Sequence, residues 1–228
     1  TMARYVMSDI HGEANRFHAM LEKIRVSADD TLYILGDVID RGVDGINLLL
    51  EIMEMPNAVM LLGNHEYMML QYLSPDAADT EIRRWNRNDN APTLTTYLKL
   101  KTKTQQRILR YLDTRPTHLE IEVNDRKFYL VHGFPGGNVH DEVWSRPEMD
   151  TPNPKPEYQL VIGHTPILSM IKPTDKRMEY AMNLEYRGEH LKIVHAPGFI
   201  NIDCGSGHAM PIKALACLRL EDMKEFYV

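Results

Sequence analysis

Cysteine is scarce in this 228-residue sequence, which contains only Cys204 and Cys217. Two thiols cannot form the disulfide framework of a small secreted domain, so a reducing compartment is expected. No apolar run reaches the ~18 residues of a transmembrane helix, and the first residues lack the pattern of a secretory signal. We therefore expect a cytoplasmic protein with no membrane partner. Thr1, which precedes Met2, resembles the remnant of a cleaved tag and is left out of the expected domain.

Positive charge is also in short supply, because 26 lysines and arginines face 32 aspartates and glutamates, for a net charge of −6. Such a chain has no general attraction for nucleic acid, so we expect no nucleic-acid partner. Any specificity for phosphate must come from a local site. Apolar residues make up 43% of the chain and charged residues 25%, which is ordinary for a folded protein. The length fits one large domain, residues 2–228, and leaves the oligomeric state open.

A short polar turn follows the apolar run 31–35, which predicts a buried strand. The turn contains Asp37, Asp40 and Arg41, and the amphipathic segment 43–54 beyond it predicts a helix. Open α/β folds bind ligands at the carboxyl ends of their strands, and this turn lies at such an end. Carboxylates can hold a metal, and the planar guanidinium of arginine suits phosphate oxygens. The turn is therefore a candidate ligand site.

Two more predicted strands, 4–7 and 58–62, end in comparable clusters. Asp9 and His11 follow the first strand, and in extended backbone both side chains would point the same way. An Asn-His pair at 64–65 follows the second. An Asp-x-His pair offers a metal one oxygen and one nitrogen. In isolation, however, the pair is better explained by structural roles, with Asp9 capping the following helix and His11 lying in a loop. Three such clusters, each beside a glycine and before a helix, favour a functional site over chance.

Two strands in the second half of the chain end in histidine. The segments 119–123 and 127–131 predict a hairpin, and His132 follows its second strand. The predicted strand 159–162 leads to His164 in the same way. The remainder is rich in β-forming residues. We expect strands at 178–186, 191–194, 199–202, 214–220 and 225–228, with the first two forming a hairpin around Gly188.

The segment 74–118 has little strand character and predicts a helical insertion beside the strand ends. A helix from about Thr104, as its N-cap, to Leu112 is expected within it. Three arginines lie around Trp85, which we expect to be exposed: Arg83, Arg84 and Arg87. They are either a solvated helix face, which is the usual outcome, or part of a lid that contacts the substrate outside its phosphoryl group.

In chain order, these motifs resemble the phosphoprotein-phosphatase branch of the metallophosphoesterases, above all its small bacterial and phage serine/threonine phosphatases. The similarity runs from about residue 5 to residue 220 and is weakest across 74–118. The motifs are Asp9-x-His11, Asp37-x-x-Asp40-Arg41, Asn64-His65-Glu66, Val131-His132-Gly133-Phe134-Pro135, Trp144-x-Arg146 and Gly163-His164-Thr165-Pro166. The resemblance implies an α+β calcineurin-like fold, with a central β-sandwich flanked by helices and a helical lid.

The resemblance also implies two divalent transition-metal ions, with manganese favoured and iron or zinc as alternatives. The first ion would be held by Asp9, His11 and Asp37, and the second by Asp37, Asn64, His132 and His164. A hydroxide between the two ions would attack phosphorus in line. His65, oriented by Asp40, would protonate the leaving oxygen. Arg41 and Arg146 would bind the non-bridging phosphoryl oxygens.

Two substrates remain in competition: a phosphorylated serine or threonine protein, which the resemblance favours, and a dinucleoside polyphosphate such as diadenosine tetraphosphate. Symmetrical diadenosine tetraphosphate hydrolases share the same metal motifs, and the segment 214–222 resembles them too. An inactive metal-binding module is less consistent with the retained catalytic motifs. The glycine pair usual after the lid Trp-Asn is replaced by Arg87-Asn88-Asp89. Structural roles are expected for His140, His195, His208, Cys204 and Glu66.

Overall fold

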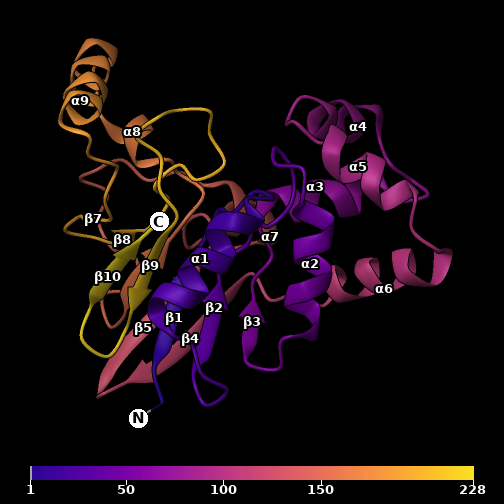
Figure 1. Ribbon diagram of the computed structural model, residues 1–228, viewed down its shortest axis with the longest axis horizontal. Coiled ribbons are helices and arrows are strands. Elements are labelled where there is room, and N and C mark those ends of the chain that lie inside the picture. The colour runs from indigo at the N-terminus through magenta and orange to yellow at the C-terminus, as the bar shows by residue number, and fades with distance from the viewer. Residues whose placement is uncertain (1) are drawn as a thin grey trace.

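The computed structural model describes residues 2–228 and contains two five-stranded sheets with helices on their outer faces (Figure 1). In order across the first sheet lie β10 (Lys224–Tyr227), β9 (Ala216–Arg219), β1 (Arg4–Met7), β2 (Thr31–Ile34) and β3 (Ala58–Met60). The second sheet contains β4 (His118–Val123), β5 (Arg126–Val131), β6 (Gln159–Ile162), β8 (Ile200–Asn201) and β7 (Val194–His195). Both sheets are mixed: β1, β2 and the edge strand β3 are parallel in the first, and the central strands β5, β6 and β8 are parallel in the second.

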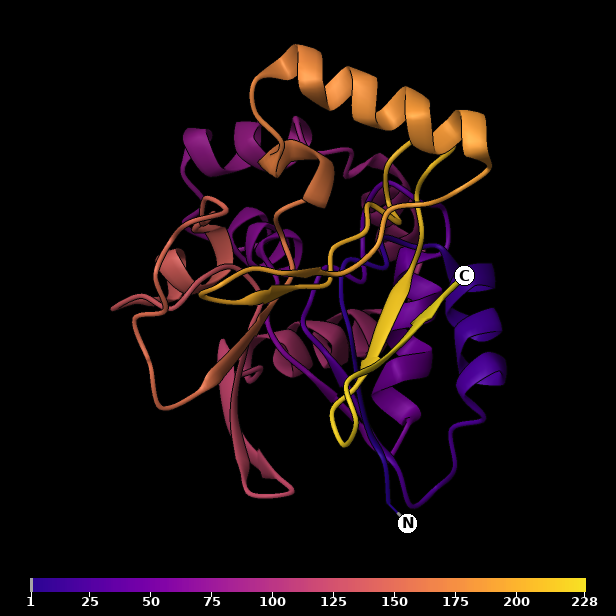
Figure 2. The same cartoon turned by 90° about the vertical axis from the view of Figure 1, so that its left-hand side faces the viewer.

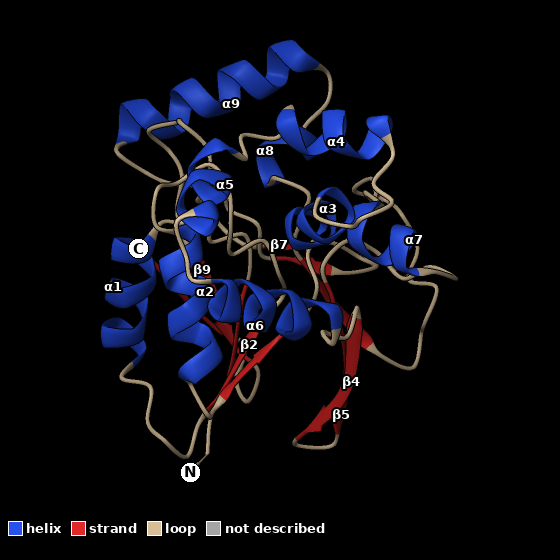
Figure 3. Cartoon of the chain, turned by 90° about the vertical axis from the view of Figure 1, so that its right-hand side faces the viewer, coloured by secondary structure: helices blue, strands red, loops and turns tan. Residues whose placement is uncertain are grey.

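In the first half of the chain, helices follow strands in the order that the sequence predicts. The helices are α1 (Ala14–Ile24), α2 (Gly45–Glu54), α3 (Asn64–Tyr72), α4 (Asp79–Asn86), α5 (Ala91–Leu98), α6 (Thr102–Asp113), α7 (Val139–Trp144), α8 (Ile167–Met170) and α9 (Thr174–Arg187). None of them, within residues 2–228, combines the length and hydrophobicity that crossing a bilayer requires. Helices α1 and α2 lie along the first sheet, as Figure 3 shows from the side.

Alternation along the strands explains why the two sheets pack face to face. On β5, Phe128 and Leu130 point into the core between the sheets, whereas Tyr129 points to the outer face of the second sheet. On β1, Val6 points into the same central core and Met7 points to the helices. The predicted β-sandwich therefore has three apolar layers, one between the sheets and one on each outer face.

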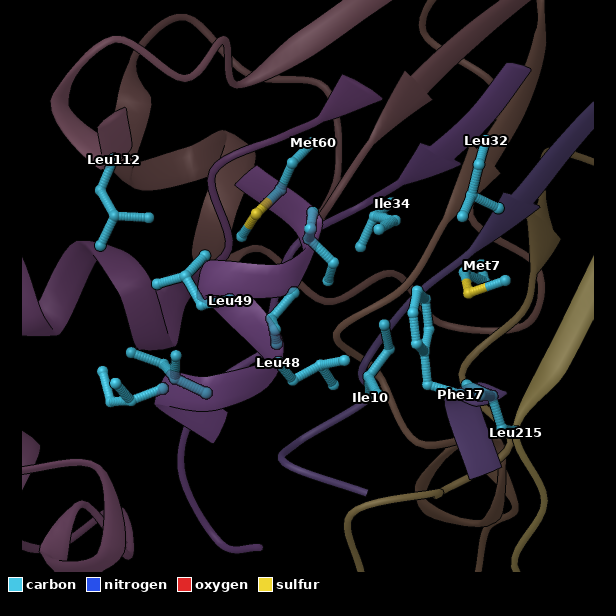
Figure 4. Close-up of a cluster of buried hydrophobic side chains, with 14 of the residues drawn as sticks. Met7, Ile10, Phe17, Leu32, Ile34, Leu48, Leu49, Met60, Leu112 and Leu215 are labelled. Carbon is cyan, nitrogen blue, oxygen red and sulfur yellow. The ribbon is translucent and has the colours of Figure 1, made fainter. Parts of the chain in front are cut away.

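The outer layer of the first sheet is filled by α1, α2 and the side chains that face them. Phe17 of α1 and Leu48 of α2 are buried against Met7 and Ile34 of the sheet (Figure 4). Helix α6 contributes Leu112 to the same layer. This packing holds the parallel strands β1, β2 and β3 side by side, so that the polar segments after them meet at one edge.

Two expectations about helices and strands are wrong. The hairpin predicted at 178–194 is the helix α9, which lies across the top of the molecule in Figure 2. Large apolar side chains alternate between residues 178 and 186, which suggested a strand, but the intervening residues favour helix. Gly188, with φ of +65°, ends the helix in the left-handed conformation. Helix α6 begins at Thr102 after the N-cap Lys101, so Thr104 is not its cap.

Candidate active site

The segments after β1 and β2 run beside one another and are joined by backbone hydrogen bonds. The N–H of His11 donates to the carbonyl of Asp37 at 2.9 Å, and the N–H of Asp9 donates to that of Gly36 at 3.2 Å. The expected extended backbone at Asp9 and His11 is wrong, because φ is +54° and +49° there. Asp37 has φ of +55° as well. Non-glycine residues in this region are strained and gather at functional sites, and here the strain turns each side chain toward a common point.

Asp37 lies at the centre of the cluster and is only 2% exposed. Its Oδ2 atom is surrounded by imidazole nitrogens: Nε2 of His132 at 3.3 Å, Nε2 of His11 at 3.6 Å and Nε2 of His65 at 3.9 Å. Its Oδ1 atom accepts the backbone N–H of His65 at 3.0 Å. A carboxylate in this position can be shared between two groups of nitrogen ligands.

The orientation of three histidines is fixed from outside the cluster. Nδ1 of His11 lies 2.9 Å from the carbonyl of Ile39, and Nδ1 of His132 lies 2.7 Å from that of Leu35. Nε2 of His164 lies 3.0 Å from the carbonyl of Trp144. In each ring the nitrogen next to a carbonyl donates to it, which turns the other nitrogen inward, toward the cluster. Histidines that hold metals are oriented in the same manner.

Two groups of side chains bring donor atoms within reach of a single ion: His11, Asp37 and His65, and Asp37, His132 and His164. Asn64 joins the second, since its Oδ1 lies 2.9 Å from Nε2 of His132. The structure therefore brings the predicted ligands together, including Asp9, whose Oδ1 lies 3.9 Å from Nε2 of His11. It also places His65, predicted only as an acid, within ligand distance of the first group.

Asp9 is held in place by both halves of the chain. Its Oδ2 accepts a hydrogen bond from the hydroxyl of Ser8 at 2.5 Å and from the backbone N–H of His164 at 2.9 Å. A Cβ added at Gly163 would lie 2.5 Å from the same oxygen, so only glycine permits this approach of the two segments. This bond connects the end of β1 to the end of β6 and joins the two ligand groups.

Burial and neighbouring charges set the protonation of the cluster. Burial would raise the pKa of Asp37, but His132 and the other imidazoles around it hold this pKa well below its ordinary value. Burial lowers the pKa of His11 and of His164 well below that of free histidine. Burial raises the pKa of Asp9. The charge of Asp37 outweighs burial at His132 and raises its pKa to about 9.

The donor set fits divalent cations. Buried imidazole nitrogens and carboxylate oxygens converge without a thiolate, since both cysteines lie elsewhere in the core. Such a mixture of nitrogen and oxygen ligands suits manganese, iron or zinc better than calcium. A cluster this deep needs positive charge to balance its carboxylates, and bound cations would supply it.

Glu66 has a larger role than the expected support of its own helix. Its carboxylate is fully buried and accepts the backbone N–H groups of Asp37 and Val38, both at 2.8 Å. It also accepts the N–H of Gly63 at 3.2 Å. Burial and the charge of Asp37 raise the pKa of Glu66 to about 7. Glu66 therefore fixes the backbone that presents the central carboxylate, and its position three residues after Gly63 is the capping spacing that could have revealed it.

The predicted pair of His65 and Asp40 is present, with Nδ1 of His65 at 2.7 Å from Oδ2 of Asp40. The expected exposed tryptophan is wrong, because Trp85 is fully buried and its Nε1 donates to the same Asp40 oxygen at 2.7 Å. Tyr72 packs edge-on against the Trp85 ring. The helical insertion is thus connected to the active site by a buried polar contact that the sequence pattern did not suggest.

Arg41 and Arg146 border a narrow cavity of about 40 Å³ above the cluster, which we call the catalytic slot. Neither arginine forms an ion pair with a carboxylate among residues 2–228. Nη1 of Arg41 lies 3.1 Å from Nε2 of His208. Burial and the nearby Arg41 lower the pKa of His208 to about 4, so a neutral imidazole accepts this bond. Both guanidinium groups remain free for an anionic ligand.

Asn88 and Asp203 also line the slot, and neither was expected there. Asp203 is 2% exposed and accepts the backbone N–H of Gly205 at 3.0 Å. Burial, followed by the charge of Asp9, raises the pKa of Asp203 well above its ordinary value. An aspartate just after the predicted strand 199–202 and two residues before a glycine is similar to the other strand ends, and this was the available signal.

The three arginines of the insertion occupy different surroundings. Arg83 pairs with Asp79 one turn away at 3.7 Å, and both side chains are exposed. The guanidinium carbon of Arg84 lies 5.9 Å from the ring centre of Trp144, a residue that lines the slot. Arg87 is exposed. Of the three, Arg84 is therefore the one directed toward the candidate active site.

Comparison with protein families and curated proteins points to one chemistry. Residues 2–195 match the calcineurin-like phosphoesterases. The symmetrical bis(5'-nucleosyl)-tetraphosphatase of Nitrosomonas europaea is 29% identical over 133 residues, which are 58% of this chain and 44% of that protein. The enzyme of the same name from Wigglesworthia glossinidia brevipalpis is 26% identical over 166 residues, covering 63% of this chain and 61% of that protein. The chain thus spans about half the length of these relatives.

Solved structures share the architecture at low identity. A candidate diadenosine tetraphosphatase superposes with a TM-score of 0.63 and 15% identity, over 100% of this chain and 93% of that one. A protein serine/threonine phosphatase from Saccharomyces cerevisiae gives a TM-score of 0.60 and 12% identity, over 96% and 72%. A cold-active protein-tyrosine phosphatase of a Shewanella species gives 0.58 and 14%, over 99% and 80%. The TM-scores demonstrate a common fold, and at such low sequence identity the similarity demonstrates only the fold.

Proposed function

Because the chain belongs to the calcineurin-like phosphoesterase family, we propose that it is a two-metal hydrolase that cleaves the phosphoanhydride chain of dinucleoside polyphosphates. The expected α+β fold with two sheets and flanking helices is confirmed. The two curated relatives described above are named as symmetrical bis(5'-nucleosyl)-tetraphosphatases, which favours this substrate over a phosphoprotein. The serine/threonine phosphatase shares the fold at 12% identity, so it does not favour the phosphoprotein reading.

One observation carries the proposal. A buried carboxylate, Asp37, is shared by two groups of potential metal ligands, and two arginines without carboxylate partners border the slot above it. Two divalent cations bound there would supply Lewis acidity toward the phosphoryl oxygens and would acidify water. Asp9, His11 and Asp37 would hold one ion, and Asp37, Asn64, His132 and His164 the other.

The residues around the slot have separate tasks in the reaction. Arg41 and Arg146 bind the non-bridging oxygens on which negative charge accumulates. The oxygen of water bonds to one phosphorus while the bond from this phosphorus to the bridging oxygen breaks. The departing nucleotide carries the bridging oxygen away, and Nε2 of His65 holds the proton that this oxygen can accept. Asp40 accepts a hydrogen bond from Nδ1 of His65, which orients the ring and stabilises its protonated form.

A substrate panel tests the proposal. We would compare kcat/KM with manganese for diadenosine tetraphosphate, a phosphoserine peptide, an aryl phosphate and an aryl phosphodiester. The expected result is the highest kcat/KM for the dinucleotide, with ADP as the sole nucleotide product because the central anhydride is cleaved. A preference for the phosphopeptide would contradict the proposal and restore the protein phosphatase hypothesis. ATP and AMP as products would contradict symmetrical cleavage.

A further inference from the structure

Two larger cavities adjoin the catalytic slot, and each shares one arginine with it. The Arg41-side cavity has a volume of about 540 Å³ and is bordered by Pro92, His208 and Ala209, among others. The Arg146-side cavity has a volume of about 500 Å³ and is bordered by Met149 and Thr165, among others. Both volumes fall within the roughly 300–1,000 Å³ that small-molecule sites occupy. The two cavities have no lining residue in common.

The cavities lie on opposite sides of the strand ends. Ala91 and Pro92, at the start of α5, line the Arg41-side cavity. Ser169 and Met170, in α8, line the Arg146-side cavity. Figure 1 shows α5 and α8 on opposite sides of the end of the molecule at which β1 and β2 terminate. A ligand that extends out of the slot in both directions would therefore enter one cavity at each end.

The Arg41-side cavity is shaped by a loop that crosses the metal cluster. A Cβ at Gly207 would lie 2.5 Å from the Cβ of His11, so only glycine allows the loop to pass this close. The next residue, His208, accepts the hydrogen bond from Arg41 and so holds the guanidinium at the boundary between cavity and slot. Lys213, which also lines this cavity, is already paired with Glu13 at 3.0 Å.

The Arg146-side cavity has a comparable distribution of charge. Lys172 in its wall is paired with Glu148 at 2.6 Å. Thr165 is 3% exposed, and its hydroxyl has no hydrogen-bond partner among residues 2–228. A buried hydroxyl without a partner is costly unless a ligand satisfies it. Met149 and Met170 give the same cavity an apolar surface that could contact a planar base.

In both cavities the arginine next to the slot forms no ion pair with a carboxylate among residues 2–228, and the lysine is paired with a glutamate. One further carboxylate lines each wall, Asp89 on the Arg41 side and Asp150 on the Arg146 side, and it disfavours negative charge on the part of the ligand that enters the cavity. This pattern suits a ligand whose negative charge lies in the slot and whose ends are uncharged and partly apolar. We infer that each cavity receives one nucleoside of a dinucleoside polyphosphate, with the central phosphates held between Arg41 and Arg146. This inference rests on the proposed function and adds to it that both nucleosides are bound at the same time.

Filling each cavity separately tests the inference. Ala209→Trp is designed to fill the Arg41-side cavity and Met149→Trp the Arg146-side cavity, and neither residue lines the catalytic slot. Each variant should raise KM for diadenosine tetraphosphate roughly tenfold and leave kcat on a small aryl phosphate unchanged, because binding alone is lost. Unchanged aryl phosphatase activity also shows that each variant is folded. The matched controls are Ala28→Trp and Met182→Trp, at exposed positions outside both cavities, and they should keep the wild-type KM.

A calorimetric titration with ADP gives a second readout that does not depend on turnover. The manganese-loaded wild type should bind two ADP molecules per chain, each single variant one, and the double variant none. If the wild type hydrolyses the dinucleotide but binds one ADP, or if either filled variant keeps the wild-type KM, the inference is wrong and the proposed function stands. If the wild type does not hydrolyse the dinucleotide, both are wrong.

Discussion

The Nε1 atom of Trp85 donates a hydrogen bond of 2.7 Å to Oδ2 of Asp40, from the helical insertion into the active site. The same oxygen lies 2.7 Å from Nδ1 of His65, and all three side chains are buried. The other oxygen of Asp40 has no hydrogen-bond partner among residues 2–228. Helix α4 therefore cannot move away from the site as a lid without breaking a buried bond to the residue that orients His65.

Replacing His65 with asparagine tests its role as the proton donor. The kcat for an alkyl phosphate, whose leaving group is a strong base, should fall by roughly 10²–10⁴. The loss should be smaller for an aryl phosphate and for a dinucleotide, because both leaving oxygens are weaker bases. Equal losses on all three substrates would show that His65 is not the acid. Metal analysis of the purified variant serves as the control, since loss of an ion would mean that His65 is a ligand instead.

Removal of Glu66 should loosen the backbone that carries Asp37. Glu66→Ala leaves several buried N–H groups without an acceptor, at a cost of about 1–3 kcal/mol each in the free energy of unfolding. We expect manganese affinity to fall roughly 10–100-fold, as for other residues that support metal ligands. Glu66→Gln keeps one acceptor oxygen, so its manganese affinity should lie between those of the wild type and Glu66→Ala. Glu51→Gln on the exposed face of α2 is the control and should behave as wild type. Wild-type metal affinity in Glu66→Ala would contradict this role.

Metal removal should abolish hydrolysis of every substrate. After dialysis against a chelator, manganese should restore kcat more fully than magnesium does, because imidazole ligands favour a transition metal. Titration of the stripped protein, followed by activity and by metal analysis, should show two manganese ions per chain at full activity. Full activity of the stripped protein would exclude a metal-dependent mechanism.

The arginines of the insertion should contribute unequally. Arg84 lies over the Trp144 ring beside the slot, so Arg84→Ala should raise KM for diadenosine tetraphosphate several-fold with little change in kcat on an aryl phosphate. The effect should fade as salt increases, because it is electrostatic. Arg83→Ala is the control, since Arg83 pairs with Asp79 on the exposed side of α4. Equal KM values for both variants and the wild type would identify Arg83 and Arg84 as parts of a solvated helix face.

Asp30 lies outside the active site and should make the free energy of unfolding depend on pH. Its carboxylate accepts the N–H of Ala3 at 2.7 Å and both the N–H and the hydroxyl of Ser27, which ties the start of β1 to the start of β2. These bonds outweigh burial and lower the pKa of Asp30. Because its pKa is lower in the folded state, the ionised Asp30 stabilises the fold at pH values above its ordinary pKa near 4. This stabilisation is lost as the pH falls below that value.

Asp30→Asn should therefore lower the free energy of unfolding by about 1–3 kcal/mol at pH 7. The difference between the two proteins should shrink as the pH falls below about 4. Denaturant unfolding of both proteins at a series of pH values measures this. A difference that does not change with pH would mean that the charge of Asp30 is irrelevant.

The sequence by itself determined the parallel half of the first sheet and the polar residues that meet at its edge. Short apolar runs before glycine and polar residues predict strands, and parallel strands that end at one edge must bring their following residues together. This is why Asp9, Asp37 and Asn64 could be expected at one edge before the fold was known. Their assignment as metal ligands, together with His132 and His164, came from the resemblance to the metallophosphoesterases. Helix α9 could not, since alternating apolar side chains between 178 and 186 imitate a strand, and only Leu184 is buried in the helix.

Only the tertiary structure decided how the cluster is supported and bounded. The left-handed backbone at Asp9, His11 and Asp37 is strained locally and persists because the surrounding segments hold it, which no local pattern reveals. Trp85 is 45 residues from Asp40 along the chain, and His208 is 167 residues from Arg41. Contacts across such separations depend on how the layers pack rather than on residue spacing. The cavities beside the slot arise from the same packing, so only the fold reveals them.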